Sequence, residues 1–344
     1  MPNCSPSADR PLVSAIIPTH RRPGLLACAL RSALRQTWPS LEVIVVVDGL
    51  DPATESLLDG FADPRLRVLL LPEPAGGAAA RNAGVHAARG EWVAFLDDDD
   101  EWMPRKIERQ MAAVRATSAW FPVISCRVVA QSPAAGRVLP LRVYQPSQPV
   151  ADYLFCRTTL ADPGGLMQTS TLLAPRDLLL ALPFNERLPL HQDWDWLIRV
   201  ASYQGVAVSM LSEPLAIWRV EDARATVGRN TDWQASLAWI REMKPIISPR
   251  AWSWFIAVQC AWRAQSSRAS LPDRARLLWA YLFQGRPEWR SFLHSLVFAC
   301  LPAGLRRTIR NRIWRNPARV SAAPALQLVF ARNPAPAALR RSAH

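Results

Sequence analysis

The sequence predicts an α/β fold in which a mostly parallel sheet is flanked by helices. Short β-branched runs alternate with segments that are apolar at helical spacing, and the connections between them are short. The second of these runs is apolar on both faces, as in a buried central strand. Half of the 344 residues are apolar and a fifth are charged, so the chain can bury a large core, and this composition excludes wholesale disorder.

Seven elements are expected within the first hundred residues. Alternation of strands and helices with short connections predicts parallel strands with helices on both faces of the sheet. The last of these strands runs directly into four consecutive aspartates. The expected strands are residues 12–18, 41–47, 66–71 and 92–96, and the expected helices are residues 23–36, 52–61 and 77–88.

Beyond residue 100 the pattern is less regular and then becomes helical. A stretch rich in Pro, Gly and Ser predicts a loop at residues 131–149. From about residue 230, tryptophans punctuate Arg-rich helical segments that have almost no strand signal. The other expected elements are helices at residues 104–117 and 193–203 and strands at residues 120–130 and 168–173.

Positive charge is concentrated in the C-terminal part of the chain. The whole sequence holds 41 basic and 28 acidic side chains, a net charge of +13, and residues 241–344 alone hold 18 basic and 3 acidic ones. A nearly neutral body with a cationic tail favours contact between the tail and an anionic surface. A preference for Arg over Lys does not by itself explain this asymmetry.

The cysteines and the apolar runs favour a cytoplasmic protein. The six cysteines are far apart and form no C-x-x-C pair, which is typical of reduced core residues. Residues 1–10 lack the apolar run of a signal peptide. No window holds 18 uninterrupted apolar residues, and the nearest, residues 292–305, is short and interrupted by polar side chains. We therefore expect a protein that does not cross a membrane but can lie on one.

Side chains suited to ligand binding follow each expected strand. In open α/β sheets, ligands bind outside the carboxyl ends of the strands. Mg²⁺ and Mn²⁺ prefer oxygen ligands and take one or two protein carboxylates together with substrate phosphates. Asp97 and Asp99 project to one side, with Asp98 opposite, if strand geometry persists. The place of these residues at the end of a buried strand favours a metal site over an acidic turn that caps the next helix.

Two further segments carry candidate site residues. Gly76 and Gly77 before Arg81 predict a close approach to the backbone and a guanidinium that can meet a phosphate, although glycines also serve a plain turn. Asp193 opens an expected helix, where it is either an N-cap or a general base that takes a proton from an attacking hydroxyl. A Walker A motif and a G-x-G-x-x-G after the first strand are absent, which disfavours kinases, ATPases and dinucleotide enzymes.

The order of these segments resembles the family 2 glycosyltransferases, which have the GT-A fold. The resemblance covers roughly residues 12–220 and implies a GT-A type, Rossmann-like sheet flanked by helices, followed by a helical Trp- and Arg-rich extension. The Q-x-x-R-W element of processive synthases is absent, which favours the addition of a single sugar. The segments that carry the resemblance read SAIIPTHRR, LEVIVVVDG, GGAAARNAGVHAARGEWVAFLDDDDEWMPRKIERQ and FNERLPLHQDWDWLIRV.

The resemblance also implies a role for individual residues. Asp193 corresponds to the catalytic base, Asp99 to the main ligand of the metal, and Asp97 to a residue near the ribose or the metal. The sequence departs from the family pattern at Gln192, where an acidic residue is usual, and in the residues around His20 and Leu50. The residues that the resemblance implies for binding the sugar nucleotide are Pro18, Thr19, Asp48, Gly77, Arg81, Asp97 and Asp98.

The implied activity is that of a metal-dependent, inverting glycosyltransferase that uses Mg²⁺ or Mn²⁺. It would move a sugar from a nucleoside-diphosphate sugar, for which a UDP-sugar is expected, to a hydroxyl of a glycan or lipid-linked acceptor. The setting would be the synthesis of a cell-surface polysaccharide or glycolipid. One alternative is an inactive α/β scaffold that binds an anionic membrane or nucleic-acid surface through its basic tail. Another is a nucleotidyltransferase of related architecture, which would lack the element around Asp193.

Several domains are expected, and the basic tail has a predicted partner. Residues 303–315 alternate Arg with apolar residues at helical spacing, which predicts peripheral attachment to the cytoplasmic face of an anionic membrane through residues 292–316. The alternative is that this helix packs on the catalytic domain, and no specific binding of nucleic acid is expected. The expected parts are a tail at 1–11, a catalytic domain at 12–229 with a nucleotide-binding half at 12–100 and an acceptor half at 101–229, a helical basic extension at 230–316, and a disordered tail at 317–344.

Overall fold

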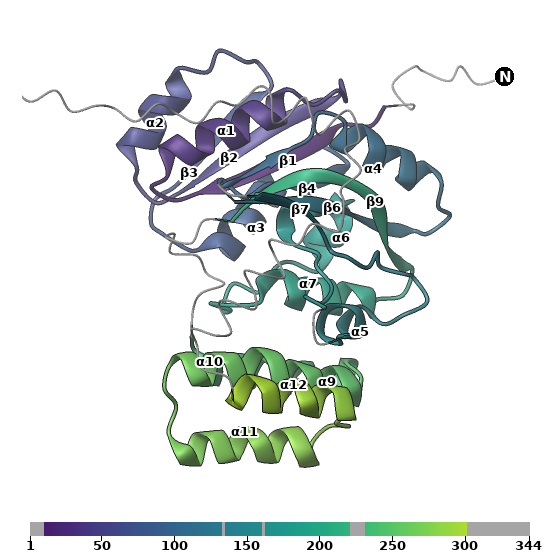
Figure 1. Cartoon of the computed structure of the whole chain (residues 1–344). Coiled ribbons are helices and arrows are strands. Elements are labelled where there is room, and N and C mark those ends of the chain that lie inside the picture. Colours follow the sequence, from purple (N-terminus) through teal and green to yellow (C-terminus); the bar gives the residue numbers. More distant parts are fainter. Residues whose placement is uncertain (1–9, 133–134, 160–161, 221–230, 301–344) are drawn as a thin grey trace, which may run out of the picture.

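The computed structural model describes residues 10–132, 135–159, 162–220 and 231–300 (Figure 1). Within them, nine strands form one sheet in the order β3-β2-β1-β4-β8-β6-β9-β5, and β7 pairs with β6 beside this path. The strands are β1 Val13–Thr19, β2 Leu41–Asp48, β3 Leu66–Leu71, β4 Trp92–Phe95, β5 Asp100–Trp102, β6 Phe121–Ser132, β7 Ala135–Leu139, β8 Leu173–Pro175 and β9 Val206–Arg219.

The helices divide into those that flank the sheet and those that follow it. The flanking helices are α1 Pro23–Leu34, α2 Pro52–Asp59, α3 Gly77–Ala87, α4 Lys106–Arg115, α5 Val150–Phe155, α6 Arg176–Ala181 and α7 Gln192–Ala201. The helices that follow are α8 Trp233–Met243, α9 Pro249–Phe255, the π-helical segment Ile256–Cys260, α10 Ala261–Ser266, α11 Leu271–Phe283 and α12 Trp289–Cys300.

The first four strands form the parallel sheet that the alternation predicts. Strand β1 lies between β2 and β4, with Ile16 opposite Ile44 on one side and Phe95 on the other. Beyond β4 the sheet is mixed, because β8 runs antiparallel to β4 and to β6, whereas β6 and β9 run parallel to each other. The prediction of an α/β sheet flanked by helices is confirmed.

Both faces of the parallel part are buried against helices. Successive side chains of a strand point to opposite faces, so Ala15 and Ile17 of β1 pack with α1 and α4, whereas Ile16 packs with α3. Glycine in α3 allows a close approach, since a Cβ on Gly84 would lie 2.5 Å from Cγ2 of Ile16. Helix α3 is therefore held tightly against the strands whose ends carry the site.

Two expectations for the middle of the chain are corrected, and two strands were missed. The predicted loop at residues 131–149 contains strand β7, which forms a hairpin with β6. The strand predicted at residues 168–173 is a single 3₁₀ turn at Thr169–Thr171, and strand β8 begins at Leu173. Strands β5 and β9 were not predicted, because β5 has three residues and β9 contains polar residues and a proline that interrupt its pattern.

The C-terminal helices pack on the sheet domain, which comprises strands β1–β9 and helices α1–α7 (Figure 1). The ring of Phe155 in α5 lies 6.3 Å from the ring of Trp239 in α8 and 5.0 Å from that of Phe255 in α9. Residues of helices α8 to α11 therefore share a core with the sheet domain. No helix of the described ranges is both long and apolar enough to span a bilayer. The predictions for residues 301–316, for the tail at 317–344 and for residues 1–9 fall outside the described residues.

Candidate active site

The predicted site residues gather where strands β1, β2 and β4 end and where helices α3 and α7 begin. Thr19 and Asp48 are the last residues of β1 and β2, and Asp97 follows β4 closely. Gly77 is the first residue of α3, and Asp193 is the second residue of α7. Since parallel strands end at the same edge of the sheet, residues far apart in the chain meet there.

The four aspartates form a turn that does not continue strand β4. The backbone N–H of Asp100 donates to the carbonyl oxygen of Asp97 over 3.1 Å. Arg22 lies 3.3 Å from Asp98 and 3.5 Å from Asp99, so these two carboxylates share a partner while Asp97 turns elsewhere. The expectation that Asp97 and Asp99 point to one side with Asp98 opposite is therefore wrong, because it requires extended backbone geometry.

Two of the aspartates are held inside the fold. Thr19 Oγ1 donates to Asp98 Oδ2 over 2.8 Å, and Ser170 Oγ donates to Asp100 Oδ2 over 2.6 Å. Burial raises the pKa of Asp98 to about 6 and raises the pKa of Asp100 well above its usual range. The N-cap of helix α4 is Arg105, so the alternative in which the acidic turn caps that helix is wrong.

The other two aspartates keep part of their surface open. The side chain of Asp97 is 32% exposed, and that of Asp99 is 20% exposed. Within the described ranges, His, Cys, Asp and Glu side chains form no group of three or more that could hold a metal ion. Mg²⁺ and Mn²⁺ are commonly bound through one or two carboxylates together with substrate phosphates. These residues therefore fit a metal whose coordination a bound diphosphate completes.

Arg81 joins the acidic turn to helix α7. Its Nη2 donates to Asp97 Oδ1 over 2.6 Å, and its Nη1 donates to Gln192 Oε1 over 3.1 Å. The guanidinium also lies 5.8 Å from the ring centre of Phe184. A Cβ on Gly77 would lie 3.1 Å from Nη1, so glycine at the start of α3 leaves room for this guanidinium. One cation thus bridges the end of β4 and the helix that carries Asp193.

Asp48 holds the loop that leads into helix α3. Its two carboxylate oxygens accept hydrogen bonds from the backbone N–H groups of Ala75, over 2.6 Å, and Gly76, over 2.9 Å. Gly76 has a φ of +90°, which glycine adopts without a steric penalty. Pro18 is buried within β1, next to Thr19. Asp48 therefore shapes the backbone at the start of α3, where Gly77 and Arg81 lie.

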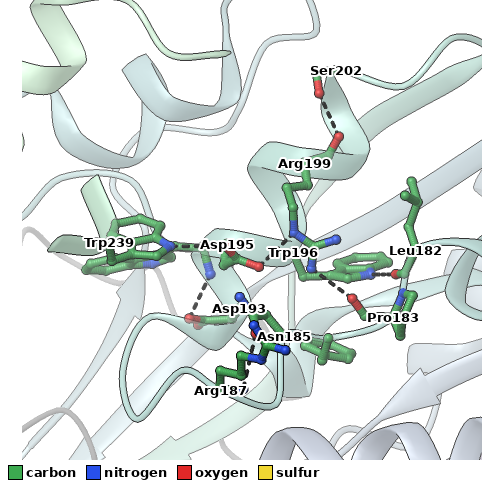
Figure 2. Close-up of polar contacts among 12 residues, drawn as sticks. Leu182, Pro183, Asn185, Arg187, Asp193, Asp195, Trp196, Arg199, Ser202 and Trp239 are labelled. Carbon is green, nitrogen blue, oxygen red and sulfur yellow. Dashed lines mark hydrogen bonds and ion pairs between the residues drawn. The ribbon is translucent and has the colours of Figure 1, made fainter. Parts of the chain in front are cut away.

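Asp193 lies in the first turn of helix α7 but does not cap it (Figure 2). The N-cap is His191, which has a φ of +63°, and Asp193 Oδ1 accepts from the backbone N–H of Trp194 over 2.9 Å. The interpretation of Asp193 as an N-cap is therefore wrong. Burial raises the pKa of Asp193 to about 6, and the positive charge of Arg81 opposes this rise. The surroundings thus raise the pKa of this carboxyl, which nevertheless remains mostly ionised at pH 7.

Sequence reasoning missed several residues that build the site. Gln192 was noted only as a departure from the family pattern, and yet it links Arg81 to helix α7. Arg22 follows the first strand by three residues, and this closeness to a strand end was the available signal. Ser170 lies far from the aspartates in the chain, so no sequence signal connected it with Asp100.

Known proteins are similar to this chain in sequence and in fold. The model of the Glycosyl transferase family 2 matches residues 14–142. The amylovoran biosynthesis glycosyltransferase AmsB of Erwinia amylovora is 27% identical over 293 residues, which span 83% of this chain and 95% of that protein. The UDP-Glc:alpha-D-GlcNAc-diphosphoundecaprenol beta-1,3-glucosyltransferase WfgD of Escherichia coli is 29% identical over 136 residues, which span 39% of this chain and 54% of that protein.

One solved structure has a similar fold over most of this chain. The mannosyltransferase PcManGT from Pyrobaculum calidifontis, solved in complex with GDP-Man and Mn²⁺, superposes with a TM-score of 0.54 at 20% identity and covers 89% of this chain and 85% of its own. The family match includes strands β1–β4, the acidic turn and Arg81. The sequence similarity to AmsB extends beyond the residues of this match. Residues 14–142 therefore match the Glycosyl transferase family 2, and AmsB is similar to this chain over most of its length.

Proposed function

We propose that this chain transfers a single sugar, with inversion, from a nucleoside-diphosphate sugar to a hydroxyl of a glycan or lipid-linked acceptor during the synthesis of a cell-surface polysaccharide. The match of residues 14–142 to the Glycosyl transferase family 2 supports a sugar transfer. The name of AmsB, which matches this chain over 95% of its own length, supports a role in building an exopolysaccharide.

One observation carries the proposal, namely the bridge that Arg81 makes between Asp97 and Gln192. A glycosyltransferase must stabilise a departing diphosphate and deprotonate an incoming hydroxyl within one site. The bridge brings a guanidinium and an acidic turn, suited to the first task, next to the helix turn that holds Asp193, suited to the second. An inactive scaffold would have no reason to keep this arrangement.

The proposed reaction is a direct displacement at the anomeric carbon of the donor. Asp193 accepts the proton of the acceptor hydroxyl while the new glycosidic bond forms and the bond to the diphosphate breaks. A carboxyl whose pKa is about 6 is ionised at pH 7 and holds the proton better than an ordinary aspartate does. The guanidinium of Arg81 meets the charge that develops on the leaving diphosphate.

A divalent metal is part of the proposal. Asp99 would be its main protein ligand and Asp97 the second, since these are the aspartates with exposed surface. When bound, Mg²⁺ or Mn²⁺ supplies a Lewis acid that neutralises the charge of the diphosphate. The PcManGT structure was solved with both Mn²⁺ and GDP-Man, which is consistent with this choice.

The donor is proposed to be a UDP-sugar that binds along the edge formed by β1, β2 and α3. The name of WfgD, a UDP-Glc-dependent enzyme that acts on a diphosphoundecaprenol-linked sugar, supports both UDP and a lipid-linked acceptor. The residues proposed to line the nucleotide site, directly or by holding its loops, are Pro18, Thr19, Asp48, Gly77, Arg81, Asp97 and Asp98.

We also propose that the protein acts at the cytoplasmic face of a membrane. Helix α11 exposes a row of apolar side chains that includes Trp279, 54% exposed, and Phe283, 72% exposed, and helix α12 continues it with Trp289. Arg274, Arg276, Arg286 and Arg290 lie on the same two helices or between them, as contact with anionic headgroups requires. The attachment surface would then comprise α11 together with the proposed segment 292–316.

Release of nucleoside diphosphate tests the proposed function. The full chain is incubated with UDP-glucose, UDP-GlcNAc or GDP-mannose and Mn²⁺, and the release of UDP or GDP is measured with and without EDTA. We expect metal-dependent release from a UDP-sugar and a loss of release in the Asp193→Asn variant. Release that is equal in the presence of EDTA would contradict the metal assignment, and normal release by Asp193→Asn would contradict the assignment of the base.

A further inference from the structure

The helix that carries Asp193 begins against a helix of the C-terminal extension (Figure 2). Trp239 of α8 donates its Nε1–H to Asp195 Oδ1 over 3.1 Å, and the other carboxylate oxygen of Asp195 accepts from Arg199 Nε over 2.8 Å. Trp239 and Asp195 are each 1% exposed. A fully buried carboxylate therefore has partners for both oxygens, and one of these partners comes from outside the sheet domain.

His191, on the other side of Asp193, meets the same helix. Its ring stacks on Trp194 at 4.9 Å and lies 4.8 Å from the ring of Trp239. Its Nε2 is hydrogen-bonded to Ser236 Oγ over 3.0 Å. Burial lowers the pKa of His191 to about 3, so the ring is neutral at physiological pH. Helix α8 thus contacts the residues two positions before and two positions after Asp193.

The backbone at His191 needs such support. Its φ of +63° is left-handed, a conformation that costs a non-glycine residue about 1 kcal/mol or more and persists only when the surroundings impose it. The carbonyl oxygen of His191 accepts the N–H of Asp195 over 2.8 Å and so closes the first turn of α7. The direction of the Asp193 side chain depends on this turn.

We infer that Trp239 and Ser236 are positioning residues that orient Asp193 by holding His191 and Asp195 on either side of it. This inference rests on the proposed role of Asp193 as the base. The described side-chain hydrogen bonds of Trp239 and Ser236 have their partners in α7, in the N-cap of α7 or in the N-cap of α8. None of these partners is a residue proposed to bind the donor. The expected effect of losing them is therefore on turnover and not on donor binding.

The test compares two buried tryptophans of the extension. Trp239→Phe keeps an aromatic ring beside His191 and removes the hydrogen bond to Asp195. The matched control is Trp252→Phe, which also removes a buried indole hydrogen bond, to the carbonyl oxygen of Ala280 over 3.3 Å, away from α7. We expect Trp239→Phe to lower kcat for release of UDP or GDP from the three sugar nucleotides about 10- to 100-fold, since small misplacements of a reacting group cost this much. The donor KM should stay unchanged, and the control should keep its kcat.

A serine pair gives a second arm should Trp239→Phe fail to fold. Ser236→Ala removes the partner of His191, whereas Ser253→Ala removes a serine that is equally buried and whose Oγ makes no hydrogen bond. Amide hydrogen exchange of residues 188–198, which requires no turnover, is measured in all four variants. Faster exchange in Trp239→Phe and Ser236→Ala than in their controls is the expected result.

Three outcomes would overturn the inference. One is an equal kcat in Trp239→Phe and Trp252→Phe, and another is exchange at residues 188–198 that matches the controls. The third is a rise in donor KM that parallels the loss of kcat, because it would indicate a general disturbance of the site. Asp193→Asn in the same assay separates the two proposals. If that variant is inactive while Trp239→Phe is normal, only the positioning fails, whereas an active Asp193→Asn overturns the base and the positioning together.

Discussion

In the parallel half of the sheet the site residues follow directly on strands, whereas in the C-terminal extension the residues nearest the site reach it across a helix interface. Thr19 and Asp48 end β1 and β2, and the acidic turn follows β4, so their order in the chain already places them at one edge. Trp239 is placed only by the way in which α8 packs on α7. The strands thus assemble the proposed donor side, and helix packing completes the side that holds Asp193.

The largest expected effect concerns Asp193, where the two regions meet. Asp193→Asn should lower turnover about 10²- to 10⁴-fold, the usual contribution of a positioned base. Its amide oxygen can still accept from the N–H of Trp194, so the first turn of α7 should persist and donor binding should remain. Steady-state kcat and the donor dissociation constant, measured calorimetrically, check this. Near-normal turnover would show that Asp193 is not the base and that α7 does not supply the proposed proton acceptor.

The wild-type protein should show the matching dependence on pH. Burial raises the pKa of Asp193 to about 6, and only the ionised carboxylate can accept a proton. We therefore expect kcat to fall about tenfold per pH unit below pH 6 and to level off above it. A profile of kcat between pH 4.5 and 8 measures this, and a flat profile would show that no group with this pKa limits turnover.

The next effect concerns the donor side alone. Asp99→Ala should lower transfer about 10²- to 10³-fold, in the range that one electrostatic contact to a developing charge contributes. It should also abolish any rise in melting temperature that Mn²⁺ produces in the presence of UDP. Asp59→Ala, an exposed aspartate at the end of α2, is the matched control. If Asp99→Ala and Asp59→Ala responded equally to Mn²⁺, the metal would be held elsewhere.

The positions of the residues on the proposed donor side can be predicted from the sequence, because strand order and strand ends determine them. The elements up to β4, the helices at 104–117 and 193–203 and the helical C-terminal part are all present near their predicted positions. Gly77, Arg81 and Asp97 were singled out from their place in this pattern, and they do lie together.

What the sequence could not supply depends on backbone turns and on packing between distant segments. The turn at the aspartates is set by one backbone hydrogen bond between Asp97 and Asp100, and without it the side chains were assigned to the wrong faces. The partner of Asp100 is Ser170, and the partner of His191 is Ser236, each more than forty residues away. A periodic pattern identifies a buried face but does not say which face it will meet.

A smaller effect tests how tightly α3 is held on the strands. Gly84→Ala would place a Cβ 2.5 Å from Cγ2 of Ile16 and 3.2 Å from Cγ2 of Val46, and overpacking of this kind costs about 1–3 kcal/mol of the free energy of unfolding. Gly24→Ala is the control, since nothing lies within 4 Å of its added Cβ. Chemical denaturation of both variants measures the difference. Equal stability would mean that α3 can shift and that the position of Arg81 is less fixed than the structure indicates.

The smallest expected effect is on the outer surface of the extension, which faces away from α7. Changing Trp279 and Phe283 together to serine should weaken sedimentation with anionic vesicles about tenfold, which corresponds to about 1.4 kcal/mol and to only part of the apolar area of two aromatic side chains. Both side chains are exposed, so melting temperature and kcat should stay unchanged. Trp120→Ser, an exposed tryptophan of the sheet domain, is the matched control. Because Arg side chains accompany this face, binding should also weaken in high salt and with neutral lipid. Equal sedimentation of the double variant and the control would contradict membrane attachment through α11. The contacts of the extension with α7, which hold Asp193 in place, would then be its remaining proposed role.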